Sequence, residues 1–94
     1  MKLMMTFTIP VERGNEGAKD GSILRAIENL IKETNAEASY FTVMDGQRAG
    51  YVVFDENDQA RLPQLNEPLF AALDAAIDIV PVLTLDDLKR GLSG

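Results

Sequence analysis

The chain has 94 residues, enough for a single domain over residues 1–94 with a modest core. Its 46% hydrophobic and 26% charged residues are ordinary for a globular protein. The net charge of −6 and the scattering of nine basic residues argue against nucleic acid and against anionic membranes as partners, since both require a basic patch. The chain has no cysteine, which excludes disulfides and thiol catalysis and fits a cytoplasmic location.

The first predicted element is a strand from Lys2 to Ile9. Residues alternate along it, so that one face is apolar throughout and the other carries Met4, Thr6 and Thr8. Pro10 ends this strand. We therefore interpret the N-terminal stretch as a strand rather than a signal peptide, and no apolar run approaches the roughly 18 to 20 residues that span a membrane.

A glycine-bearing segment with Gly14, Gly17 and Gly21 follows, and it predicts a flexible surface loop. A helix is then expected with Asp20 or Ser22 as its cap and an end near Asn35. Its apolar residues recur at helical spacing and predict one buried stripe: Ile23, Leu24, Ile27, Leu30 and Ile31.

The segment from Glu37 to Phe54 predicts a hairpin. Asp45 and Gly46 suit a type I′ turn, in which both central residues have positive φ. This register places Tyr40 opposite Tyr51, Thr42 opposite Ala49, and Phe41 opposite Gly50. One face of the hairpin, expected to pack under the helices, carries Phe41, Val43, Val52 and Phe54.

A polar turn from Asp55 to Asp58 leads to a second predicted helix from Gln59 to Ala75. Pro63 suits its first turn, whereas Pro68 predicts a kink or a restart. A calcium loop is rejected for the turn, because Ala60 stands where such a loop needs glycine and Asn66 where it needs glutamate.

A fourth strand is predicted from Ala76 to Leu83, with Pro81 placing it at a sheet edge because proline donates no backbone hydrogen bond. The run from Thr84 to Asp87 resembles a capping box and predicts a short last helix that ends at Gly91.

The predicted order is βαββαβ followed by a short helix, an α+β chain with a four-stranded antiparallel sheet and two helices on one face. The segments MTFTIPVERGNE (5–16), SYFTVMDGQRAGYVVF (39–54), EPLFAALDAAIDIVPVLT (67–84) and TLDDL (84–88) make the chain resemble small bacterial proteins of the ferredoxin-like, dimeric α/β-barrel superfamily. The resemblance implies the strand order 4-1-3-2. It also implies a homodimer in which two sheets pack face to face.

The same superfamily includes isomerases, cofactor-independent monooxygenases and haem-degrading enzymes, so the resemblance implies assembly more firmly than activity. This chain departs from the catalytic branches because it lacks the histidine and the tryptophan on which they commonly rely. No cofactor and no metal is expected.

The face of the sheet away from the helices is the predicted binding face. Two phenols and three threonine hydroxyls are expected on it, in an otherwise apolar setting typical of small-molecule pockets: Tyr40, Tyr51, Thr6, Thr8 and Thr42. The competing interpretation is that these strand-forming residues only build a dimer interface.

Two charged residues are further candidates. Arg13, which follows the first strand and precedes Gly14, would attract an anion; a plain surface loop is the alternative. Asp78 is the carboxylate expected on the open face, either as a general base or as a rim residue paired with an arginine.

Two functions remain open. The first is a homodimeric module that binds a small aromatic or amphipathic metabolite between its sheets. The second is a cofactor-independent isomerase or monooxygenase in which Asp78 abstracts a proton and the tyrosines orient the substrate.

Overall fold

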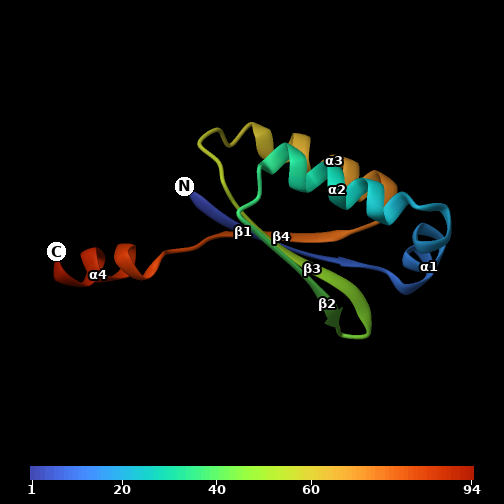
Figure 1. Cartoon of the computed structure of the whole chain (residues 1–94), viewed down its shortest axis with the longest axis horizontal. Coiled ribbons are helices and arrows are strands. Elements are labelled where there is room, and N and C mark those ends of the chain that lie inside the picture. The colour runs from blue at the N-terminus through green and yellow to red at the C-terminus, as the bar shows by residue number, and fades with distance from the viewer.

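The computed structural model describes the whole chain, Met1–Gly94. Figure 1 shows a sheet covered on one face by two long helices, with a further helix at one end and the last helix standing apart. In chain order the elements are β1 (Lys2–Ile9), α1 (Val11–Asp20), α2 (Ser22–Thr34), β2 (Ala38–Met44), β3 (Gln47–Asp55), α3 (Arg61–Leu73), β4 (Ala76–Pro81) and α4 (Leu85–Ser93).

The sheet has the strand order β2-β3-β1-β4, and all neighbours are antiparallel. This confirms the α+β, ferredoxin-like arrangement and the order 4-1-3-2. β4 pairs only with β1, so Pro81 lies on an edge strand as predicted. The strand ends at Pro81 rather than Leu83.

The core lies between the inner face of the sheet and the helices α2 and α3. β1 alternates as predicted, since Leu3, Met5, Phe7 and Ile9 are all buried. Residues of β3, of α2 and α3, and Ala75 before β4 complete the cluster: Val52, Phe54, Leu30, Leu65, Leu69, Leu73 and Ala75. Burial of these apolar side chains holds the helices on the sheet.

The hairpin between β2 and β3 forms as predicted. Asp45 and Gly46 both have positive φ, 53° and 76°, as a type I′ turn requires. The predicted pairs follow: Tyr40 opposite Tyr51, Phe41 opposite Gly50, and Thr42 opposite Ala49.

The glycine-bearing segment is not a loop but the helix α1, and the loop prediction was wrong. Pro10 precedes the helix in an extended conformation, and its carbonyl accepts a hydrogen bond from the Gly14 N–H at 2.8 Å. Close packing explains Gly17 better than flexibility does, whereas the atom nearest to Gly14 is the movable end of the Arg48 side chain. A Cβ at Gly14 would lie 2.6 Å from the Arg48 guanidinium, and one at Gly17 would lie 2.7 Å from Ile23. Only Gly21, with a φ of 81°, serves as a break between α1 and α2.

The C-terminal ends of α2 and α3 agree closely with the sequence. Asn35 ends α2 in the left-handed conformation, and Asp74 ends α3 in the same way. The predicted cap of α2 and the predicted end of the last helix were wrong, since Gly21 precedes α2 without a side-chain cap and α4 continues through Gly91 to Ser93. α3 continues through Pro68 as one element, so the predicted restart is absent. None of the helices has the length and apolar character needed to cross a membrane.

The last helix, α4, projects away from the body of the protein on an extended linker (Figure 1). Thr84 caps it in the predicted capping box: its hydroxyl accepts from the Asp87 N–H at 3.1 Å, and the Asp87 carboxylate accepts from the Thr84 N–H at 3.2 Å. The hydrogen bond with the Thr84 backbone is the main cause that lowers the pKa of Asp87 below its usual 3.8, and the hydrogen bond with the Thr84 side chain lowers it further.

Gly50→Ala is expected to lower the free energy of unfolding by about 1 to 3 kcal/mol, because the added Cβ has no space in the packed core. It would lie 2.6 Å from the buried ring of Phe7 and 2.9 Å from Phe41. Urea unfolding measures the loss. Gly91→Ala is the control, since nothing lies within 4 Å of that position. Equal stability of the two variants would contradict the packing.

Acid is expected to weaken α4 before it affects the core. The pKa of Asp87 is lower in the folded helix than in the unfolded chain, so the capping interaction is fully present above the unfolded pKa and is lost as the pH falls through the folded pKa. NMR carbon shifts of α4, followed from about pH 5 to pH 2, report this loss. Asp87→Asn should abolish the transition and Asp86→Asn should retain it; an unchanged transition in Asp87→Asn would refute the assignment.

Candidate binding face of the sheet

The uncovered face of the sheet carries one polar row that crosses all four strands. Tyr40 on β2 is paired with Tyr51 on β3, Tyr51 with Thr6 on β1, and Thr6 with Asp78 on β4. Because opposite residues in an antiparallel sheet present their side chains to the same face, these four side chains stand side by side. The open-face row, as we call it, joins four of the residues that the sequence singled out.

The rows on either side differ from each other in character. On one side lie small and hydroxyl-bearing residues: Thr42, Ala49, Thr8 and Ala76. On the other side lie apolar residues: Ala38, Val53, Met4 and Val80. The open face therefore grades from apolar to hydroxyl-rich, with the phenols between, which suits an amphipathic molecule better than a purely apolar one.

The polar groups of the open-face row have no partners within the chain. The hydroxyls of Tyr40, Tyr51 and Thr6 and the carboxylate of Asp78 make no side-chain hydrogen bond. Tyr40 is 70% exposed, and Tyr51 is half-buried between its neighbours. The row thus offers hydroxyl donors at one end and a carboxylate acceptor at the other.

Arg13 lies elsewhere, in the corner between α1 and α2. Its guanidinium donates to the Ser22 hydroxyl at 3.1 Å and lies 3.7 Å from Glu16 and 3.9 Å from Asp20. The side chain and backbone of Ser22, with a smaller effect of Arg13, hold the pKa of Asp20 below its usual value.

A surface hollow of about 290 Å³ borders Arg13, and three carboxylates line it together with Pro10: Glu12, Glu16 and Asp74. A site with three carboxylates and one arginine repels an anion. The structure therefore does not bring Arg13 to the open-face row, and it surrounds Arg13 with negative charge.

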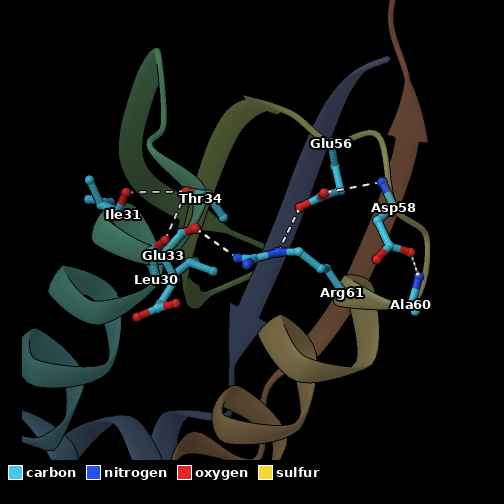
Figure 2. Close-up of polar contacts among 8 residues, drawn as sticks. All are labelled: Leu30, Ile31, Glu33, Thr34, Glu56, Asp58, Ala60 and Arg61. Atoms are coloured by element: carbon cyan, nitrogen blue, oxygen red, sulfur yellow. Dashed lines mark hydrogen bonds and ion pairs between the residues drawn. The ribbon is translucent and has the colours of Figure 1, made fainter.

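The acidic turn before α3 forms a structural brace instead of an ion site (Figure 2). The Arg61 Nε donates to Glu56 at 3.1 Å, and its Nη2 donates to the Glu33 carbonyl at the end of α2 at 2.9 Å. Asp58 accepts from the Ala60 N–H at 3.0 Å and so stabilises the turn that precedes the helix. Arg61 thereby ties the last turn of α2 to the first turn of α3. No sequence motif predicts this contact, because Arg61 and Glu33 are 28 residues apart in the chain.

One expectation about the hairpin was wrong. Phe41 and Val43 are on the helix side of β2 as predicted, yet they are 52% and 69% exposed. The reason is that α2 packs against β3 and α3, so the helix layer stops short of the edge strand β2. The uncovered strip and the flank of α2 form an apolar groove of about 300 Å³, here called the β2 groove. Its lining is Phe7, Ile9, Ile23, Leu24, Ile27, Phe41, Thr42, Arg48 and Ala49.

No family model matches the chain, and no curated protein sequence matches it. Among solved structures it is similar to the de novo designed protein Ferredog-Diesel, with a TM-score of 0.51, 12% identity, and coverage of 86% of this chain and 85% of that one. This likeness concerns the fold alone. The chain is thus a small α+β protein of the ferredoxin-like fold.

Two further solved structures show weaker likeness. The periplasmic divalent cation tolerance protein CutA from Archaeoglobus fulgidus has a TM-score of 0.48 and 14% identity over 96% of this chain and 97% of that one. A single-residue variant of CutA1 from Pyrococcus horikoshii OT3 has a TM-score of 0.44 and 16% identity over 99% and 96%. Neither likeness carries an argument about function.

Arg61→Ala is expected to lower the free energy of unfolding by about 1 kcal/mol, because it leaves Glu56 and the Glu33 carbonyl without a donor. Thermal unfolding measures the change. Arg90→Ala is the control, since that arginine pairs only with Asp87 on the exposed helix α4. A loss no greater than that of Arg90→Ala would contradict the bracing role.

Proposed function

We propose that two copies of this chain join through their open sheet faces and enclose a chamber that binds a small aromatic or amphipathic molecule. The observation that carries the proposal is the open-face row, in which two phenols, a hydroxyl and a carboxylate without partners cross an otherwise uncovered sheet. An open face with hydroxyls at one side and Met4 and Val80 at the other supplies both polar and apolar contacts.

Burial of apolar surface between two copies contributes about 25 cal/mol per Å² toward association. Lost translational freedom and the ordering of side chains at the interface oppose it. A molecule that fills the chamber adds contacts only in the dimer, so its binding and dimerisation stabilise each other.

The row also limits the chemistry of the ligand. Flat phenol rings favour a stacked aromatic ring. The carboxylate of Asp78 favours a hydrogen-bond donor, and it disfavours an anion at that end of the row. Arg13 lies outside the row, so the proposed chamber does not use it.

A second candidate function is a cofactor-independent isomerase or monooxygenase. The observation that favours it is the position of Asp78, the carboxylate opposite Thr6 and in line with both phenols. There Asp78 would accept a proton from a substrate that the phenols orient. Asp78→Asn separates the two functions: in a binding module it changes affinity alone, whereas in an enzyme it abolishes turnover of the bound compound.

Val53→Asp is expected to convert the dimer to a monomer, because it places a charge in the centre of the joined faces. Sedimentation velocity at about 10 µM should give twice the chain mass of 10.3 kDa for the wild type and the single mass for the variant. Phe70→Asp, which alters an exposed residue of α3 on the opposite side of the fold, should remain dimeric. A monomeric wild type would refute the proposed assembly.

The ligand itself is sought by native mass spectrometry of freshly purified protein. In solution, 2-naphthol serves as a neutral aromatic probe, and calorimetry measures its affinity. Tyr40→Phe is expected to weaken binding about fivefold, as loss of one hydrogen bond does. Ser93→Ala on α4 should not change it. Equal affinity of wild type, Tyr40→Phe and Asp78→Asn would remove the open-face row from the binding site.

A further inference from the structure

The helix α4 is an amphipathic element that lacks a surface to pack on. Leu85, Leu88 and Leu92 recur at positions i, i+3 and i+7, form one stripe and are 65%, 45% and 81% exposed. Leu83 on the linker is exposed as well. Figure 1 shows the helix far from every other element. A helix of nine residues is marginal alone in water, even with a capping box, so the leucine stripe needs a partner surface.

The β2 groove is an apolar surface of this chain that no helix covers. Phe7 and Ile9 form part of its floor, while Leu24 of α2 and Phe41 of β2 stand exposed at its rim. A third helix beside α2 would cover it. The groove and the leucine stripe of α4 are therefore complementary: each leaves large apolar side chains in water that the other would bury.

Within one chain, the first turn of α4 cannot reach the β2 groove. β4 ends at Pro81, which pairs with Leu3, whereas the groove lies at the Phe7 and Ile9 end of β1. The separation is about 13 Å along the strands, and about 14 Å more across the sheet from one edge to the other. The linker 82–84 reaches about 10 Å. On the helix side, α2 and α3 also lie between β4 and the groove.

We propose that α4 of one copy docks in the β2 groove of a second copy, with its leucine stripe facing Phe41 and Leu24. Charge complementarity supports this occupant: Arg48 lines the groove, and the first turn of α4 carries Asp86; neither forms an ion pair within the chain. The acidic first turn therefore lies at the Arg48 end of the groove. This contact goes beyond the proposed dimer because it uses neither the open-face row nor its ligand.

Cross-linking between copies tests the contact, and the absence of native cysteine makes every introduced thiol specific. A Leu24→Cys chain and a Leu88→Cys chain are mixed and treated with a short bismaleimide. The expected result is a heterodimeric product on a denaturing gel. Leu24→Cys mixed with Arg90→Cys is the matched control, because Arg90 lies on the opposite side of α4 from the stripe. We expect at least fivefold less product from the control.

A chain that carries both Leu24→Cys and Leu88→Cys shows whether α4 docks in the groove of a second copy or in the groove of its own copy. Product at twice the chain mass supports the proposal, whereas an internal link that leaves the mass at 10.3 kDa overturns it. Equal yields with Arg90→Cys, or no product at all, also overturn it. Repeating the reaction in Val53→Asp keeps the two proposals apart. The short helix α4 alone does not hold that variant together in sedimentation at about 10 µM, but the bismaleimide traps the contact covalently, so a cross-link that persists there does not depend on the joined sheet faces.

Discussion

The burial of one face of β1 under the helices is the constraint from which the rest of the structure follows. Leu3, Met5, Phe7 and Ile9 enter the core together, and the period of two along a strand then forces Met4, Thr6 and Thr8 to the other face. A slip by one residue would exchange the two sets. The position of Thr6 in the open-face row is thus fixed by the hydrophobic effect acting on its neighbours.

The helix layer and the sheet differ in extent, and that mismatch leaves apolar surface in water. α2 and α3 are held together by their own contacts and by the Arg61 brace, which joins the end of α2 to the start of α3 (Figure 2). A pair fixed in this way covers the central strands and leaves the inner side of β2 in water. Apolar surface that a single copy leaves uncovered is available to another copy, at both the open face and the β2 groove.

Polar residues in this chain fall into two groups with different roles. Asp20, Glu56 and Arg61 are paired within the fold, where they connect helices that the chain brings close. Arg13 donates to Ser22 through Nη2, while its buried Nη1 has no hydrogen-bond partner. The residues of the open-face row make no such side-chain hydrogen bonds. This contrast is the basis for proposing that a ligand binds on the sheet rather than at the charged turns, because groups paired within the fold have less to offer a ligand.

Local pattern by itself determined the strands, the type I′ turn at Asp45 and Gly46, the edge position of β4 and the cap at Thr84. Each depends on interactions within a few residues, and the pairing of Tyr40 with Tyr51 follows from the turn. Tertiary structure decided that Gly14 and Gly17 belong to a helix, in which a side chain at position 17 would press against Ile23. It also decided that Arg61 reaches Glu33, that Arg13 stays apart from the open-face row, and that Phe41 remains exposed. The physical reason is that these outcomes depend on how far packed helices extend over a sheet, which the spacing of residues along the chain does not encode.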